Sequence, residues 1–266
     1  MIDVQWKGKI GYGDIVSPIC YAHNVSYNTG QRVVLNFRWD TGPDYKFKPS
    51  DPETLWERAN FIHSICDKKE TDVDIVHLFN NPMEENHTNY DWNIVGKDRF
   101  HNYWNPLAKH RNRPEGKHIV INSTFGNQVS LKQYGKSWKD PLAGRWVTMV
   151  HMLKQKNIDV VVVDYTTPIR DLVTALSSAR AFIGYHGTAA WVARFIQVPS
   201  IIIGGKKGLT FDAFPNAHIL LDTEVAPFVN GIDSHIGVAR AKQRACTIDF
   251  KAYNLPRKTL RHLVIS

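Results

Sequence analysis

The residues best placed to do chemistry lie in one segment, 181–205, which reads AFIGYHGTAAWVARFIQVPSIIIGG. Its pattern predicts a short buried strand at 181–183, a turn of small residues at 184–190, a helix at 191–196 and another strand at 200–203. A glycine-rich turn that opens a helix gathers unpaired backbone N–H groups at the positive end of the helix dipole, so it favours an anion. In a parallel sheet this point also lies at the carboxyl ends of the strands, where ligands bind. The alternative is a helix start whose glycine and alanines serve only close packing.

A similar pattern stands near the N-terminus. A strand is expected at 4–10, the turn Gly11-Tyr-Gly-Asp14 follows, and a helix is expected over 15–27. The two glycines let a substrate approach the backbone, although simple turn glycines would look the same. Asp14 can cap the helix that follows it. Two strand–turn–helix elements of this kind favour a ligand site over a packing role alone.

The composition indicates a folded globular protein. The chain has 266 residues, of which 43% are hydrophobic and 11% aromatic, enough for one large domain or two small ones. No stretch approaches the roughly 18 consecutive apolar residues of a membrane span, and the N-terminus lacks the apolar core of a signal peptide. The three cysteines are widely spaced, which suits a reducing compartment. We therefore expect a cytoplasmic protein without a membrane span.

The net charge is +8, and many of the basic residues are clustered. One group of basic residues, interleaved with aromatic residues, lies at 97–118, and a second group lies at 240–261. Cations mixed with aromatic rings can neutralise phosphates and stack on bases, which favours a polyanionic partner, whereas a solubilising surface is the alternative. The residues singled out as acceptor contacts in the first group are Trp104, Lys109, Arg111 and Arg113.

Strands and helices alternate along the chain, which predicts an α/β protein with parallel sheets and helices on both faces. The polar, proline-rich segment 80–116 separates two such series. We therefore expect two Rossmann-like domains facing a cleft, at 1–115 and 116–266. The expected strands of the second domain are 118–123, 158–163, 181–183, 200–203 and 218–221, and its helices are 141–154, 169–180, 191–196 and 234–246.

Three motifs in this order resemble the ADP-heptose:lipopolysaccharide heptosyltransferase family. They are the Gly-Asp-apolar start at 11–19, the Lys-x-Trp motif at 136–138, and the strand–turn–helix followed by Val-Pro and a strand at 182–203. The resemblance implies a GT-B-like fold, with two facing Rossmann-like domains, and a metal-independent glycosyltransferase. It requires no cofactor, since the nucleotide-sugar is a co-substrate. The sequence contains no Asp-x-Asp motif in a suitable loop and no histidine spacing typical of zinc, so no metal ligands are expected.

The resemblance also implies roles for individual residues. Asp14 corresponds to the catalytic base, with Gly11, Tyr12 and Gly13 beside the acceptor. The donor-binding candidates are Ser123, Thr124, Lys136, Asp164, His186, Gly187, Thr188 and Ala189. Three of these have a structural alternative: Lys136 as a surface lysine, His186 as a packed histidine, and Asp164 as the cap of the next turn.

The sequence departs from the family in ways that affect the substrate more than the fold. The family's Asp-(Ser/Thr)-Gly-x-x-His is replaced by 185–191, and only one helix fits between 163 and 181. The expected acceptor is a hydroxymethylated pyrimidine in double-stranded DNA, as for phage enzymes in the host cytoplasm, with Trp104 filling the gap left by the extruded base. A lipopolysaccharide or other surface saccharide is the alternative acceptor. A non-catalytic nucleic-acid-binding protein is the alternative from another class. The sugar, the nucleotide base, the stereochemical outcome and the oligomeric state stay open.

Overall fold

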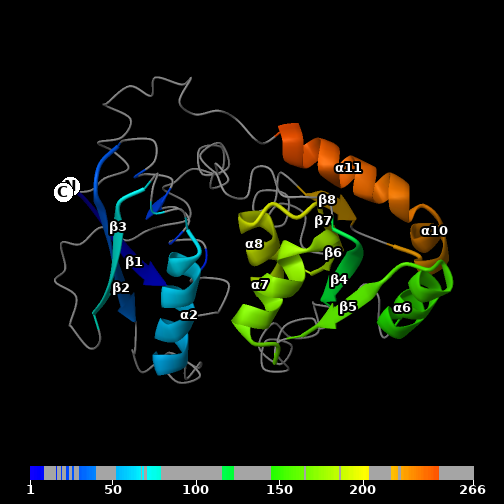
Figure 1. Cartoon of the computed structure of the whole chain (residues 1–266), viewed down its shortest axis with the longest axis horizontal. Helices are drawn as coiled ribbons and strands as arrows, with labels where there is room; N and C mark the ends of the chain where they lie inside the picture. Colours follow the sequence, from blue (N-terminus) through cyan, green and yellow to red (C-terminus); the bar gives the residue numbers. More distant parts are fainter. Residues whose placement is uncertain are drawn as a thin grey trace. The chain divides into compact units, whose positions relative to one another are not determined.

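The computed structural model describes residues 1–8, 16, 19, 22, 23, 26, 30–39, 52–66, 68, 71–78, 116–122, 145–164, 166–185, 187–203, 217–220 and 223–245. The chain divides into two compact units, and the described residues up to 78 belong to the first and those from 116 to 245 to the second. Both units combine helices with a parallel sheet (Figure 1). The predicted α/β class with parallel sheets is confirmed, while the domain roles stay a prediction.

The first unit is built on a three-stranded parallel sheet of order β1-β2-β3. Its strands are β1 (Ile2–Gly8), β2 (Val33–Trp39) and β3 (Val73–Leu78), and helix α2 (Pro52–Ser64) contacts β3. Proline is favoured at the first position of a helix, where its missing N–H has no partner to lose. The sequence predicts a helix that begins near Ser50 and carries an apolar stripe through Leu55, Ala59, Ile62 and Ile65, and Ala59 and Ile62 are buried. The strand expected at 4–10 begins two residues earlier, at Ile2.

Helical residues also follow β1 in this unit. Val16, Ile19, Ala22, His23 and Ser26 are helical and buried, and their spacing of three or four residues places them on one face. The helix expected over 15–27 is thus confirmed at the residues that the structure describes.

The second unit contains a five-stranded parallel sheet of order β5-β4-β6-β7-β8. Its strands are β4 (His118–Asn122), β5 (Val160–Val163), β6 (Ala179–Gly184), β7 (Ser200–Ile203) and β8 (His218–Leu220). Every residue of β7 is buried, as expected of an interior strand covered on both faces. On β5, at the edge of the sheet, Val161 and Val162 are exposed.

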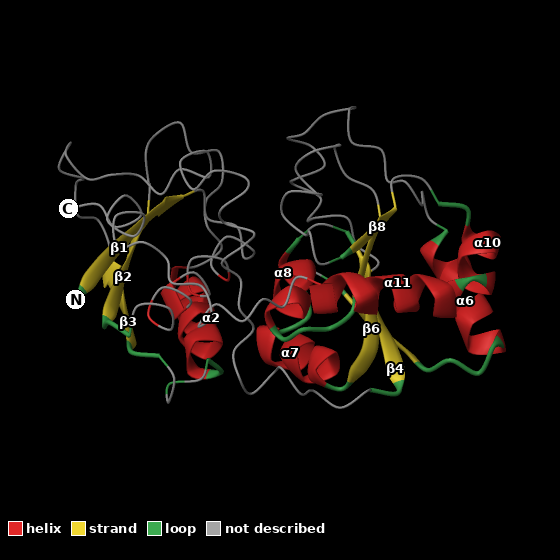
Figure 2. Cartoon of the chain, turned by 90° about the horizontal axis from the view of Figure 1, so that it is seen from above, coloured by secondary structure: helices red, strands yellow, loops and turns green. Residues whose placement is uncertain are grey.

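Helices cover both faces of this sheet (Figure 2). One core combines alternate strand residues such as Ile121 and Ile183 with Met149 of α6 (Trp146–Gln155). The same core includes residues of α10 (Val225–Asn230) and α11 (Ile232–Ala245). The intervening residues Val120, Phe182 and Ile202 of the inner strands are also fully buried and point to the other face. That face is covered by α7 (Ile169–Ser177) and α8 (Thr188–Phe195), which contact each other and β6.

Several sequence-based boundaries in this unit were wrong, and the strand expected from 158 begins at Val160. Helix α8 begins at Thr188 rather than at 191, because the N–H of Trp191 already donates to the carbonyl of Gly187 at 3.1 Å. Helix α7 ends at Ser177, and the strand begins at Ala179 because that residue pairs with His118 on β4. The terminal helix expected from 234 is preceded by α10, and its own first residue is Ile232.

Each unit contains a pair of histidines that joins two of its elements. In the first unit, His23 Nε2 lies 3.1 Å from His63 Nδ1, and His23 Nδ1 lies 2.7 Å from the Thr71 hydroxyl. In the second unit, His218 Nε2 lies 3.0 Å from His235 Nδ1 and links β8 to α11. A ring that is protonated on both nitrogens can only donate, so neither pair can accept a proton on both rings and keep its hydrogen bond.

The histidine pairs predict that acidification destabilises the protein. Burial lowers the pKa of His218, with further lowering by His235 and Lys242, and burial also lowers the pKa of His235. The unfolded chain therefore binds more protons than the folded one between the ordinary histidine pKa of about 6.5 and the lower folded values. In this window the free energy of unfolding falls as the pH falls. Thermal unfolding between pH 8 and pH 5 should show this slope.

Replacing one ring tests the assignment of this slope. His235→Gln should flatten it, whereas replacing the exposed His151, which bonds only to Gln155 on its own helix among the contacts described, should leave it unchanged. An identical slope in His235→Gln and wild type would contradict the prediction.

Candidate functional site

The strand order of the second unit creates a topological switch point between β4 and β6. From β4 the chain passes through α6 to β5 on one side, and then through α7 to β6 on the other side of β4. In an open parallel sheet this reversal leaves a crevice at the carboxyl ends of the two strands, and ligands bind there. The strands end at Asn122 and Gly184. The predicted donor-binding residues of the 186–189 turn therefore follow one of the two strands that flank the switch point.

The two strands approach each other closely at this edge. Ile121 pairs with Ile183, so Asn122 and Gly184 come next in register. A Cβ added at Gly184 would lie 2.7 Å from the ring of Phe182 and 3.0 Å from Cβ of Asn122. Close packing thus accounts for the glycine at 184.

Packing does not account for the glycine at 187. Its φ of 174° and ψ of −168° are extended backbone that any residue adopts. A Cβ added there meets no atom of the described residues within 4 Å. Among the described residues, none blocks the approach of a ligand to the backbone of Gly187 at the switch-point edge of the sheet, and we call this side of the residue its open face. The packing alternative does hold for Ala189 and Ala190, which are both buried.

Helix α8 begins at this open face. In the described part of the chain no side chain caps it, and its first turn carries no acidic residue. The first N–H groups of a helix have no partner within it, and they carry the positive end of the dipole. Thr188, the first helical residue, is half-buried and follows Gly187 directly. The start of α8 can therefore accept a phosphate-like anion.

A buried polar pair joins α6 to the end of β6. The indole N–H of Trp146, the first residue of α6, donates to the hydroxyl of Tyr185 at 3.1 Å. The two rings meet edge to face, with centroids 5.1 Å apart and an interplanar angle of 86°. Neither residue is among the site residues predicted from the sequence. A tyrosine within a turn of otherwise small residues was the available signal, whereas nothing in the sequence indicates that Trp146 is its partner.

Asp164 follows β5 and is held within its own turn. Its Oδ1 accepts hydrogen bonds from the Thr166 N–H at 2.8 Å, from the Thr166 hydroxyl at 2.6 Å and from the Thr167 N–H at 3.2 Å. These bonds, chiefly that of the Thr166 hydroxyl, lower the pKa of Asp164, although its exposure to water weakens the effect. The capping role considered from the sequence is therefore present, and a contact with the donor stays a prediction.

Most of the other predicted site residues lie outside the described part of the chain. They are Gly11, Tyr12, Gly13, Asp14, Trp104, Lys109, Arg111, Arg113, Ser123, Thr124, Lys136 and His186. Their roles stay predictions.

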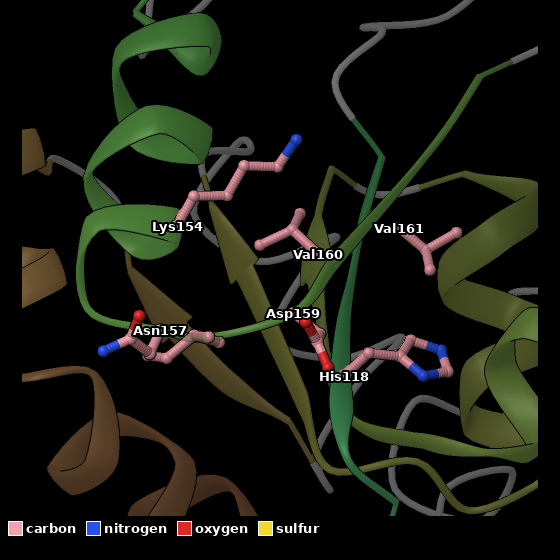
Figure 3. A pocket seen from close by; sticks show the side chains of 7 residues that line it. His118, Lys154, Asn157, Asp159, Val160 and Val161 are labelled. Carbon is pink, nitrogen blue, oxygen red and sulfur yellow. The ribbon is translucent and has the colours of Figure 1, made fainter.

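A surface hollow lies at the opposite edge of the same sheet (Figure 3). Its lining includes His118 at the start of β4, Val160 at the start of β5 and Lys154 near the end of α6. Parallel sheets bind ligands at their carboxyl edge, and this hollow lies at the amino edge. We therefore do not assign it to the candidate site.

The described residues contain no group of three or more histidine, cysteine, aspartate or glutamate side chains that could hold a metal ion. Among the helices that the structure describes, none has the length and apolar character needed to span a membrane.

No protein-family model and no curated protein matches this chain. Similar solved structures include the dodecameric, iron-containing glycosyltransferase TibC from enterotoxigenic E. coli H10407, with 12% identity over 94% of this chain and 76% of TibC and a TM-score of 0.48. TibC in complex with ADP-D-beta-D-heptose gives 11% identity over the same shares and a TM-score of 0.43. The spinosyn rhamnosyltransferase SpnG, complexed with thymidine diphosphate, gives 14% identity over 92% of this chain and 70% of SpnG, with a TM-score of 0.36. At these low scores and identities, the similarity by itself shows neither a shared fold nor a shared reaction.

Proposed function

We propose that this chain is a nucleotide-sugar-dependent glycosyltransferase that transfers a sugar to a hydroxyl acceptor. The observation that carries the proposal is the switch point between β4 and β6, where Gly187 precedes helix α8 and no described residue lies within 4 Å of a Cβ added to it. A diphosphate is the ligand group that best suits a glycine turn and a helix N-terminus at such a point. The motifs that resemble the heptosyltransferase family place the nucleotide-sugar at this same turn.

The proposed reaction assigns complementary roles to the candidate residues. The acceptor hydroxyl gives its proton to the Asp14 carboxylate while its oxygen forms a bond to the anomeric carbon of the sugar. The bond from that carbon to the diphosphate oxygen breaks, and the diphosphate leaves with the bonding electrons. Backbone amides at 187–189, with Lys136 and His186, stabilise the developing negative charge. We propose residues 116–266 as the donor-binding domain and 1–115 as the acceptor-side domain of a GT-B-like enzyme.

Donor binding can be tested directly. A nucleoside diphosphate should raise the unfolding temperature in the presence of a chelator, because the proposed site uses amides and cations rather than a metal. Ligand at about 100 times its dissociation constant stabilises the folded state by about 2.7 kcal/mol. Differential scanning fluorimetry with ADP, GDP, UDP, CDP and dTDP checks this, with the matching nucleosides as controls for base stacking alone. Stabilisation by no member of the panel, or only with a divalent ion, would contradict the proposed metal-independent site.

The acceptor is a separate part of the proposal. The basic and aromatic residues at 97–118 support hydroxymethylated DNA in a cytoplasmic setting, and the resemblance supports a lipopolysaccharide-type saccharide. One assay distinguishes them: labelled nucleotide-sugar is offered together with hydroxymethylated duplex DNA and a core oligosaccharide. Label only in the saccharide would exclude the DNA acceptor. Salt-dependent DNA binding without transfer to either acceptor would favour the non-catalytic alternative.

A further inference from the structure

The Trp146–Tyr185 pair lies directly next to the turn that opens α8. Tyr185 is the residue after β6, and Gly187 follows two positions later. Trp146 and Tyr185 are 5% and 3% exposed, so the hydrogen bond between them is shielded from water. An indole N–H only donates, so the tyrosine oxygen is the acceptor and its own proton points away from Trp146.

The pair fixes the direction in which the chain leaves β6. Ile183 and Tyr185 are two positions apart in the extended chain, so they lie on the same face. Both belong to the core that includes Met149 of α6. The ring of Tyr185 therefore continues the buried row of β6 by one position beyond the last strand residue. The hydrogen bond and the edge-to-face contact hold this ring in one orientation against α6. One residue separates the fixed Tyr185 from Gly187, so the orientation of Tyr185 limits where Gly187 can lie.

We propose that Trp146 and Tyr185 are positioning residues, whose hydrogen bond holds the turn between β6 and α8 so that the amides at the start of α8 point at the bound anion. The identity of that anion as the donor diphosphate rests on the proposed function. Neither residue touches the ligand in this proposal. Tyr185 acts through the backbone that follows it, and Trp146 acts through Tyr185. The alternative is a buried polar pair that contributes to stability alone.

The experiment uses Tyr185→Phe, which removes only the hydroxyl oxygen, and a matched control. Ser200→Ala is the control because Ser200 is 3% exposed, donates to the Val198 carbonyl at 2.8 Å, and lies at the amino end of β7 in the same sheet. Each variant removes a buried hydroxyl that takes part in a described hydrogen bond, and the two hydroxyls lie at opposite ends of the strands of this sheet. Circular dichroism and denaturant unfolding establish that each variant folds and how much stability it loses.

Two readouts then separate positioning from stability. The first is amide hydrogen exchange at Trp191, whose N–H donates to the Gly187 carbonyl and so reports on the turn without any ligand. The second is the dissociation constant of the nucleoside diphosphate that stabilises wild type most. We expect Tyr185→Phe to speed exchange at Trp191 and to weaken binding at least about fivefold, the lower range of coupling between distinct sites. Ser200→Ala should change neither.

Unchanged exchange at Trp191 in Tyr185→Phe would overturn the positioning role, whatever the stability of the variant. Equal effects of Tyr185→Phe and Ser200→Ala on the exchange of Trp191 and on the affinity for the nucleoside diphosphate would also overturn it. If no nucleoside diphosphate binds to wild type, the proposed function fails, and the exchange of Trp191 still decides whether the pair holds the turn. Trp146→Phe and the double variant provide a further check, because their effects on exchange should not add to that of Tyr185→Phe.

Discussion

Replacing Asp14 with asparagine is expected to lower turnover at least about 100-fold, the range that general-base catalysis supplies. Asparagine has nearly the same shape as aspartate, but its amide cannot take the proton of the acceptor hydroxyl. Asparagine also caps a helix as well as aspartate does. The helical residues that follow, such as Val16 and Ile19, should therefore keep their packing. Steady-state kinetics with labelled nucleotide-sugar measures the loss of turnover.

Two further measurements on Asp14→Asn separate catalysis from structure. Its unfolding temperature and its affinity for the nucleoside diphosphate should both match those of wild type. Asp14→Ser, which also keeps a capping side chain, should lose turnover to a similar degree. Near-normal turnover in Asp14→Asn would leave Asp14 as a helix cap and would require a different base.

Adding one methyl group should weaken nucleoside diphosphate binding at Gly187 and lower the stability of the fold at Gly184. The methyl group of Gly187→Ala meets no atom of the described residues within 4 Å and the backbone is extended, so the unfolding temperature should stay near that of wild type. Its methyl group would stand where the proposed phosphate approaches the backbone. Loss of one hydrogen bond to a charged group, worth about 1.5–3 kcal/mol, should weaken nucleoside diphosphate binding about tenfold or more.

Gly184→Ala is the matched control, three residues earlier in the same segment. Its methyl group would collide with Phe182 and Asn122, and overpacking of this kind costs about 1–3 kcal/mol of stability. For a chain of this size each kcal/mol lowers the unfolding temperature by about 2–4 °C. Isothermal titration and thermal unfolding of both variants check the pair of predictions. Unchanged affinity for the nucleoside diphosphate in Gly187→Ala would contradict a diphosphate site at this turn.

The sequence by itself predicted the elements that its local patterns encode. Runs of β-branched residues such as 160–163 and 200–203 predicted strands, and the spacing of Ala59 and Ile62 predicted the buried face of α2. These patterns are local, because alternation and helical spacing act over a few residues. The helix start at Thr188 was placed too late, because small residues suit both a turn and a helix and only the hydrogen bond from Trp191 to Gly187 distinguishes them.

The tertiary structure alone decided how these elements combine into a site. The order β5-β4-β6-β7-β8 results from strand pairing between distant segments, and this order places the switch point between β4 and β6. Trp146 and Tyr185 are 39 residues apart, and only the packing of α6 on the sheet brings them into contact. The two glycines look alike in the sequence, yet Gly184 is required by its neighbours, whereas no neighbour in the described part of the chain requires Gly187. That difference depends on the atoms around each Cα, which no local pattern specifies.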